Sequence, residues 1–381
     1  MNKLAKGARE MLSGNAKDVY MRSRAHVVAA RYGNPGLSLK VIAVVGTNGK
    51  QTTASYLNEL LQEAGHTTRL LLAEDDEPLG PVQVQSFLRE AKKANARYAI
   101  VTLNSADIRC HSIDAAGLEL VVATNISQTA TETVEDQVEA IGQLLEEKPR
   151  YIILNHDDDY YAALADFEAT AQKMTYGQHE QAEARMTEWH LYRKGSELRL
   201  VIDHQTTLEL ATHLIGTANL YNLAAATASV YIMGENIESI DEGAARLESI
   251  PFNYQYLKTE APYDVVVDYA PNEVALTRLV ASAKQLTKRR LIAVVQADTT
   301  SDECIELLSK DTARLIVIDI NDFKRDKGTI ERIVSPDAAI KLALRGARQD
   351  DIVILAGPLF TRHNDDGTPY AQAALTNFMQ D

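Results

Sequence analysis

The segment VIAVVGTNGKQTT, residues 41–53, places an apolar run, a glycine-containing loop and a helix-forming stretch in immediate succession. Such a loop binds phosphate, because glycines let backbone N–H groups approach the anion and the following helix presents its positive end. Lys50 has the spacing needed to reach terminal phosphates. Gly46 and Gly49 have a simpler alternative role as turn residues. We expect the loop to bind ATP or ADP through Gly46, Thr47, Asn48, Gly49, Lys50, Gln51 and Thr52.

One residue of this loop does not suit magnesium chemistry. The residue after the lysine normally offers a hydroxyl that ligates Mg²⁺, and here it is the amide Gln51. Thr52 and Thr53 are imperfect substitutes. Val44 also stands where the general phosphate-loop pattern has its first glycine. The sequence therefore predicts a nucleotide and leaves magnesium an open question.

Further apolar runs indicate the fold class. Runs at 41–46, 68–73, 98–103, 118–124 and 151–155 alternate with amphipathic segments. Continuous apolar strands separated by helices are typical of a parallel sheet with helices on both faces. We predict an α/β protein.

Changes of pattern suggest three regions. The first, 1–40, is predicted as a helical segment that stops at Gly33 and Pro35. The second, 41–251, should end with a small antiparallel sheet over 187–212 and a helical stretch over 219–249. The third, 252–381, repeats the strand and helix alternation, with strands at 263–270, 290–297, 314–320 and 351–357.

Composition excludes several classes of protein. The 381 residues carry a formal charge of -14, which argues against nucleic acid or an anionic membrane as the main partner. Cys110 and Cys304 are too few for a disulfide framework. Neither an apolar run of membrane-spanning length nor a secretory signal is present. We expect a cytoplasmic protein.

Ordered landmarks point to one family. The loop GTNGK is followed by TNIS (124–127), LNHDDD (154–159), TYG (175–177), IGTANLYNLAAATA (215–228), VVDYA (266–270) and DIVILAG (351–357). This order resembles the Mur ligase superfamily, which adds amino acids to cell-wall precursors with ATP and includes folylpolyglutamate synthases. The resemblance is strongest to the branch that adds diaminopimelate or lysine. It implies a P-loop ATPase-like central domain followed by a Rossmann-like C-terminal domain.

The resemblance also assigns roles to several positions. It places Asn219 and Asn222 near adenine, although helix capping is an equal alternative. Asp268 would face the nucleotide across a domain cleft or merely cap a loop. Mur ligases normally carry an N-terminal domain for a uridine nucleotide, whereas 45 residues precede Gly46. We expect recognition of a UDP-linked precursor to be altered.

The residues that hold metal and acyl phosphate in the family are replaced here. By the resemblance, Thr102 stands for a glutamate, Thr129 and Ala130 for an Asp-His pair and Asn253 for an arginine. Gly142 stands for a carbamylated lysine if the two sequences are matched without a gap. Pro271 and Asn272 replace a His-Thr pair, AGPLFTR replaces A-G-K-G-H-E, and INDFKR (320–325) does not match the D-N-P-R motif. One divalent ion needs several converging oxygen donors. We therefore expect no catalytic residue and no metal site.

Other polar groups have ordinary explanations. Asp157, Asp158 and Asp159 precede a helix-forming stretch, where acids are favourable without any metal. The histidines lack the spacing of metal ligands.

Three functions remain open. The first is a catalytically degenerate, nucleotide-binding homologue that acts through a partner protein in cell-wall synthesis. The second is an active ATP-dependent amide ligase that forms its product through an acyl phosphate. The third is an interaction module that has lost even nucleotide binding.

Overall fold

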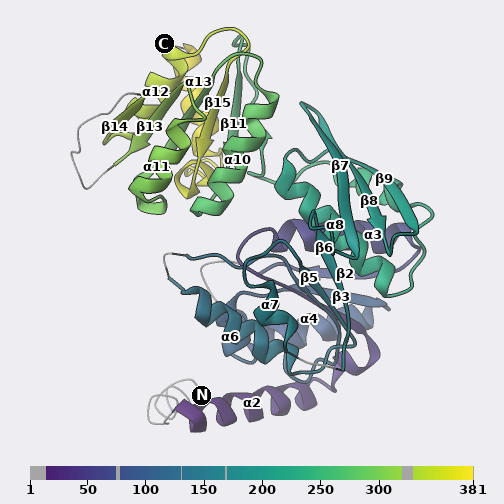
Figure 1. The fold of residues 1–381 in the computed structure, drawn as a ribbon. Helices are drawn as coiled ribbons and strands as arrows, with labels where there is room; N and C mark the ends of the chain where they lie inside the picture. Colours follow the sequence, from purple (N-terminus) through teal and green to yellow (C-terminus); the bar gives the residue numbers. More distant parts are fainter. Residues whose placement is uncertain (1–13, 74–77, 130, 168–169, 320–328, 381) are drawn as a thin grey trace.

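The computed structural model describes residues 14–73, 78–129, 131–167, 170–319 and 329–380, which form two sheets (Figure 1). The strands of the first sheet are β1 Lys40–Val45, β2 Thr68–Leu71, β3 Tyr98–Thr102, β4 Leu118–Ala123, β5 Tyr151–Asn155, β6 Gln172–Gly177, β7 Ala184–Tyr192, β8 Gly195–Ile202 and β9 Thr206–Thr212. Their order across the sheet is β2-β3-β1-β4-β5-β6-β7-β8-β9. Strands β1 to β6 pair in parallel.

Strand β1 shows why the sheet is covered on both faces. Val41, Ala43 and Val45 belong to one apolar core, and Ile42 and Val44 belong to the other. Successive side chains of a strand point to opposite faces, so a continuous apolar run needs a cover on each side. Helices α3 Lys50–Glu63, α8 Thr217–Ile232 and α9 Ile240–Arg246 cover one face, and α4 Pro81–Lys93, α5 Ser105–Arg109, α6 Val134–Leu145 and α7 Tyr161–Ala165 cover the other. The predicted α/β class is confirmed.

Two sequence predictions for this half need correction or refinement. The antiparallel strands β7 to β9 do not form a separate small sheet, because Tyr176 and Gly177 of β6 pair in parallel with the start of β7 and continue the first sheet. The helical stretch expected over 219–249 is present, but it is divided into two helices. Helix α8 ends at Ile232, and Gly234 turns the chain with φ +69° before α9 begins at Ile240. Glycine adopts this left-handed conformation without the steric cost that other residues bear.

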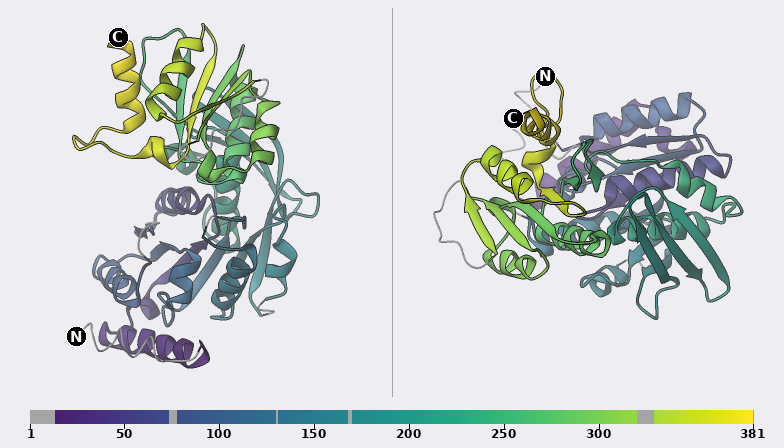
Figure 2. Two further views of the ribbon diagram at one scale, coloured as in Figure 1. Left: turned by 90° about the vertical axis from the view of Figure 1, so that its left-hand side faces the viewer. Right: turned by 90° about the horizontal axis from the view of Figure 1, so that it is seen from above.

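The helix predicted near the N-terminus is α2, Gly14–Arg31, in the described part of that region (Figure 2). Its own residues Met21, Ala25 and Ala29 are buried. The helix also bonds to the body of the protein, because His111 Nε2 lies 2.9 Å from Asp18 Oδ1. Gly33 follows the helix with φ +80°, which agrees with the predicted stop signal. A short 3₁₀ helix, Pro35–Ser38, then leads into β1.

The second sheet has the order β10-β11-β15-β12-β13-β14. Its strands are β10 Gln255–Tyr256, β11 Asp264–Asp268, β12 Leu291–Gln296, β13 Arg314–Ile318, β14 Ile330–Ile333 and β15 Ile352–Ala356. Helices α10 Glu273–Leu286 and α11 Asp302–Ser309 pack on one face, and α12 Pro336–Gly346 and α13 Tyr370–Gln380 on the other. Short 3₁₀ turns occupy Ala297–Thr299 and Pro358–Thr361. The sequence did not predict β10 or β14, and position 320 of the strand predicted at 314–320 lies outside the described residues.

Helix starts in this half are set by local chemistry. The side chains of Asn272, Ser301 and Ser335 accept hydrogen bonds from the backbone of the first turns of α10, α11 and α12. Such caps satisfy N–H groups that have no acceptor inside the helix. We propose residue 251 as the end of the first domain, because β10 already pairs with β11 of the second sheet.

The strand order also fixes where a ligand can bind. The chain runs from β1 to β2 on one side of β1, and from the neighbouring strand β4 to β5 on the other side. Ligands of open α/β sheets bind beyond the carboxyl ends of strands at such a reversal. The loop after β1 lies at this point, and residues of the second half such as Asp268 line the same cavity as the loop. Among the described residues, no helix is long and apolar enough to cross a membrane.

Candidate functional site

A cleft of about 600 Å³ lies between the two halves and is lined by residues from both. All ten positions predicted from the sequence to bind a nucleotide line this cleft. They are Gly46, Thr47, Asn48, Gly49, Lys50, Gln51, Thr52, Asn219, Asn222 and Asp268. The fold therefore brings into one place residues that are more than 200 positions apart in the chain. Their contact with a nucleotide stays a prediction.

The two loop glycines are required by the local geometry. Gly46 has φ +124°, and a Cβ there would lie 2.3 Å from Thr124 Oγ1. Gly49 has φ +83°, and a Cβ would lie 2.2 Å from Asn222 Oδ1. Both conformations are strained for other residues, and both positions lack room for a side chain. The glycines thus keep the backbone close to its neighbours and open toward the cleft.

The loop is anchored on the end of β4. Thr47 N donates to Asn125 O at 2.7 Å, and Thr124 Oγ1 donates to Asn48 O at 2.7 Å. Asn125 Nδ2 also donates to Asn48 O at 2.9 Å. Thr47 Oγ1 in turn donates to Gln137 Oε1 at 2.6 Å. The TNIS landmark is therefore a support for the loop, which its position after a strand did not by itself reveal.

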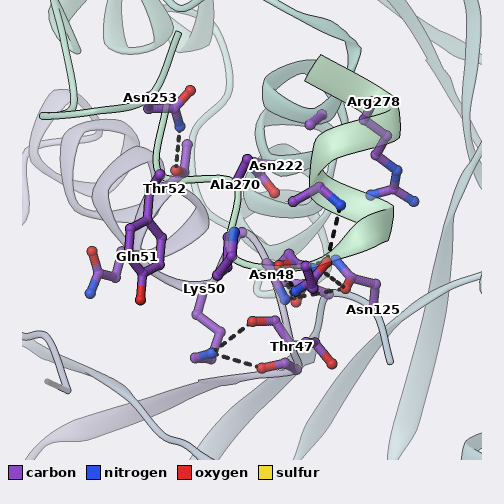
Figure 3. A pocket seen from close by; sticks show the side chains of 18 of the residues that line it. Thr47, Asn48, Lys50, Gln51, Thr52, Asn125, Asn222, Asn253, Ala270 and Arg278 are labelled. Atoms are coloured by element: carbon purple, nitrogen blue, oxygen red, sulfur yellow. Dashed lines mark hydrogen bonds between the residues drawn. The ribbon is translucent and has the colours of Figure 1, made fainter. Parts of the chain in front are cut away.

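Lys50 is folded over its own loop. Its Nζ donates to Gly46 O at 2.8 Å and to Thr47 O at 3.1 Å, as Figure 3 shows. Lys50 is also the first residue of α3, so its ammonium group lies where the positive end of a 14-residue helix meets the loop. The arrangement concentrates positive charge beside the backbone cradle.

An amide cluster joins the loop to the linker that precedes β10. Asn219 Nδ2 donates to Asn253 Oδ1 at 2.7 Å, and Asn253 Nδ2 donates back to Asn219 Oδ1 at 3.0 Å. Asn253 Nδ2 also donates to Thr52 Oγ1 at 3.1 Å. Asn222 accepts a bond of 3.3 Å from Thr53 Oγ1. These amides are neutral, so the cluster holds two segments together without adding charge to the cleft.

Asp268 uses both carboxylate oxygens within its own turn. Oδ2 accepts from Tyr254 N at 2.7 Å, and Oδ1 accepts from Ala270 N at 2.9 Å. Removal from water raises the pKa of Asp268 to about 6, although the two hydrogen bonds oppose the rise. The residue borders the cleft but caps a loop, which was the simpler of its two expected roles.

Two further residues of the cleft come from α10 and were not foreseen as ligand contacts. Asn272 bonds to Asn48 of the loop, and Arg278 lines the cleft beside Tyr221. A helix far along the chain gives no local signal of this kind. Only its packing against the loop reveals these contacts.

Comparison with known proteins identifies the family. The model of the Mur ligase middle domain matches residues 44–230, and that of the Mur ligase glutamate ligase domain matches residues 254–359. The chain belongs to the Mur ligase family. It is 26% identical over 376 residues to UDP-N-acetylmuramoyl-L-alanyl-D-glutamate--2,6-diaminopimelate ligase of Syntrophomonas wolfei, covering 88% of this chain and 76% of that protein. The protein of the same description in Solibacter usitatus is 28% identical over 372 residues, covering 87% and 74%.

Solved structures share the fold. The MurF ligase of Thermotoga maritima in complex with ADP superposes with a TM-score of 0.72 at 14% identity, covering 97% of this chain and 84% of that chain. Folylpolyglutamate synthase of Mycobacterium tuberculosis, complexed with ADP and AMPPCP, has a TM-score of 0.69 at 14% identity and covers 94% and 96%. The family resemblance and the two-sheet Mur ligase architecture expected from the sequence are confirmed.

The positions that would hold metal in a Mur ligase are engaged elsewhere. Gln51 Nε2 donates to Ala73 O at 3.3 Å, so its amide is turned toward the strand. Thr102 is fully buried, and its Oγ1 accepts from Ala73 N at 2.6 Å. The hydroxyl of Thr129 closes its own turn by accepting from Glu132 N at 3.0 Å. Ala130 and the INDFKR segment, 320–325, lie outside the described residues.

The packing around Gly142 of α6 leaves no room for a larger side chain. A Cβ at this position would lie 2.5 Å from the ring of Phe167. The helix α6 therefore has no room here for the lysine that the resemblance expects.

The acidic residues that line the described cleft do not converge on Lys50. They are Asp107, Glu132 and Asp268. Asp107 accepts from the backbone of Leu79 and Asn104, and Glu132 pairs with Arg109. Within the described ranges, no group of three His, Cys, Asp or Glu side chains could hold a metal ion. Among the described residues, the cleft thus offers a phosphate loop with Lys50, and the absence of a metal site stays a prediction.

Proposed function

We propose that this Mur ligase homologue binds ATP or ADP in the cleft without magnesium and forms no amide bond. Its role would then be nucleotide binding or scaffolding, exerted through a partner protein related to peptidoglycan precursor synthesis. The proposed site holds the nucleotide with Lys50, backbone N–H groups and neutral amides, and without a metal ion.

Nucleotide binding is supported by the intact phosphate loop. Gly46 and Gly49 have the conformations and close contacts of a backbone cradle, and Lys50 stands at the start of α3. The cleft is large enough for a nucleotide, since small-molecule sites occupy about 300–1,000 Å³. Relatives of the same fold have been solved with ADP. Asn219 and Asn222 would lie at the adenine end.

The loss of catalysis is supported by one observation above all. Each described position that should offer a metal ligand bonds to another part of the protein or has no room for the required side chain. Phosphoryl transfer needs positive charge that neutralises the moving group, and magnesium ions normally supply most of it. One magnesium ion needs several oxygen ligands that converge on it. Amide and hydroxyl groups that are already hydrogen-bonded within the protein do not provide such a set.

Calorimetry tests both parts of the proposal. ATP and ADP are titrated into the protein in magnesium chloride and in EDTA, and into Lys50→Ala. We expect equal affinity in the two buffers and loss of binding in the variant. Lys173→Ala is the matched control, because Lys173 Nζ also donates to two backbone carbonyls, of Ala165 and Phe167, but lies outside the cleft. Binding that requires magnesium would overturn the proposal.

An active amide ligase is the second candidate, and the retained Lys50 and loop geometry favour it. It predicts ADP and phosphate release when the protein is mixed with MgATP, a UDP-linked acceptor and amino acids such as diaminopimelate or lysine. The first proposal expects no release above that of Lys50→Ala. Complete absence of nucleotide binding would leave only an interaction module.

A further inference from the structure

Arg278 lines the cleft without a carboxylate partner. It lies on α10, is half-buried, and has its guanidinium carbon 5.7 Å from the centre of the Tyr221 ring. Among the residues that the structure describes, no hydrogen bond or ion pair engages the guanidinium. A guanidinium carries five N–H donors in a planar fork, and such a group in a cleft is suited to an oxyanion.

The described neighbours of Arg278 lie close to its guanidinium without forming a hydrogen bond or ion pair with it. Tyr221 donates its hydroxyl proton to Asp157 Oδ2 at 2.6 Å, and the same oxygen accepts from Gln178 N at 2.5 Å. Asp158 accepts from the backbone N–H groups of Ile126 at 2.8 Å and Tyr160 at 3.0 Å. The two nearby carboxylates are therefore engaged by other donors. Stacking on Tyr221 fixes the guanidinium while its N–H groups stay available.

The side chain of Arg278 points toward the phosphate loop. In Figure 3 its side chain projects from α10 toward the part of the cleft that contains Asn48 and Asn125. The helix is held there, because Asn272 at its start bonds to Asn48 of the loop. Six residues of helix correspond to about 9 Å of rise, so Arg278 lies less than two turns from this contact.

The cleft contains few basic side chains that could offset the charge of a nucleotide. Lys50 and Arg278 are the basic side chains among the described residues that line the cleft. The terminal phosphates of ATP carry several negative charges that a magnesium ion normally offsets. Among the described residues, no group of three His, Cys, Asp or Glu side chains could hold such an ion. We propose that Arg278 binds the terminal phosphates of the nucleotide held by the loop, and so supplies positive charge from the second half of the protein. This inference rests on the proposed nucleotide binding.

The alternative is that Arg278 only joins α8 to α10 through its stack on Tyr221. The two roles differ in how they depend on the ligand's phosphates. A phosphate contact affects ATP and ADP and leaves adenosine unchanged. A purely structural stack affects every ligand of the cleft to the same extent.

The test titrates ATP, ADP, AMP and adenosine in EDTA into the intact protein, Arg278→Gln and Arg278→Lys. We expect Arg278→Gln to weaken ATP binding at least about tenfold, since a hydrogen bond to a charged group contributes this much. Adenosine binding should not change. The ATP affinity of Arg278→Lys should lie between those of the intact protein and Arg278→Gln, because lysine keeps the charge but lacks the planar fork of N–H donors. Arg89→Gln is the matched control, because Arg89 stacks 4.7 Å from the Tyr32 ring outside the cleft.

The outcomes separate this inference from the function on which it rests. If the intact protein binds ATP and Arg278→Gln binds it equally well, only the role of Arg278 is overturned. The same holds if the variant weakens all four ligands equally. If the intact protein binds none of them, nucleotide binding fails together with this inference.

Discussion

Asn48 and Asn272 form a reciprocal amide pair between the phosphate loop and the second half of the protein. Asn48 Nδ2 donates to Asn272 Oδ1 at 3.3 Å, and Asn272 Nδ2 donates to Asn48 Oδ1 at 2.8 Å. Asn272 also caps α10 by accepting from Ala275 N at 3.1 Å. One side chain thus starts a helix and holds that helix against the loop.

Replacing Asn272 with serine should open the cleft. Serine keeps the helix cap but is too short to reach Asn48. We expect a larger radius of gyration in small-angle X-ray scattering, with a loss of about 1 kcal/mol or less in the free energy of unfolding. Ser335→Ala removes a cap of α12 and serves as a control, because it should lower stability without opening the cleft. An unchanged radius for Asn272→Ser would show that other contacts hold the halves together.

Gly49→Ala should disrupt the loop more than backbone strain alone explains. Its Cβ would meet Asn222 Oδ1, whereas a Cβ on Gly65 at the other end of α3 would meet nothing within 4 Å. The two glycines have nearly equal φ angles, +83° and +85°. We expect both alanine variants to lose about 1–2 kcal/mol of unfolding free energy from strain, and only Gly49→Ala to lose nucleotide binding. Equal effects of the two on calorimetric affinity would contradict the role given to the contact.

The effect of Gly142→Ala on the free energy of unfolding should change sign when Phe167 is replaced by alanine. In the intact protein the added methyl group meets the Phe167 ring, so we expect a loss of about 1–3 kcal/mol in denaturant unfolding. With Phe167→Ala the space is open, and the same substitution should stabilise α6 by up to about 1 kcal/mol, because alanine is the better helix former. The double-mutant cycle measures this coupling. Additive effects would mean that Phe167 does not exclude a side chain here.

The raised pKa of Asp268 should make the free energy of unfolding depend on pH. Because its pKa is raised to about 6 in the folded state, folding favours the protonated carboxyl. Its contribution to stability is complete below the pKa of the unfolded chain and is lost as pH rises through 6. The unfolding free energy of the intact protein, measured relative to Asp268→Asn, should therefore fall between pH 4 and pH 7. A constant difference over this range would show that the carboxyl is not desolvated.

Much of the architecture follows from local sequence. Ile42 and Val44 alternate with Val41 and Ala43 in a run that is apolar throughout, and such a run must be covered on both faces. Gly46, Gly49 and Lys50 define the loop by spacing alone. The stop of α2 at Gly33 is equally local, because glycine supplies a left-handed turn without strain.

Contacts between distant segments could not be predicted in this way. No local pattern reveals that β7 continues the first sheet beside β6, because strand pairing depends on which edge is left open. The break of the helix at Gly234 was missed because isolated glycines are tolerated in helical patterns.

The sequence by itself determined the α/β class and the glycine and lysine spacing of the phosphate loop, since each depends on residue type and spacing over a short stretch. Only the tertiary structure decided that Asn272 holds the loop, that Phe167 fills the space above Gly142, and that Arg278 faces the cleft. Those relationships join residues up to 224 positions apart, and they exist because the packing of two sheets brings their helices to a common cleft.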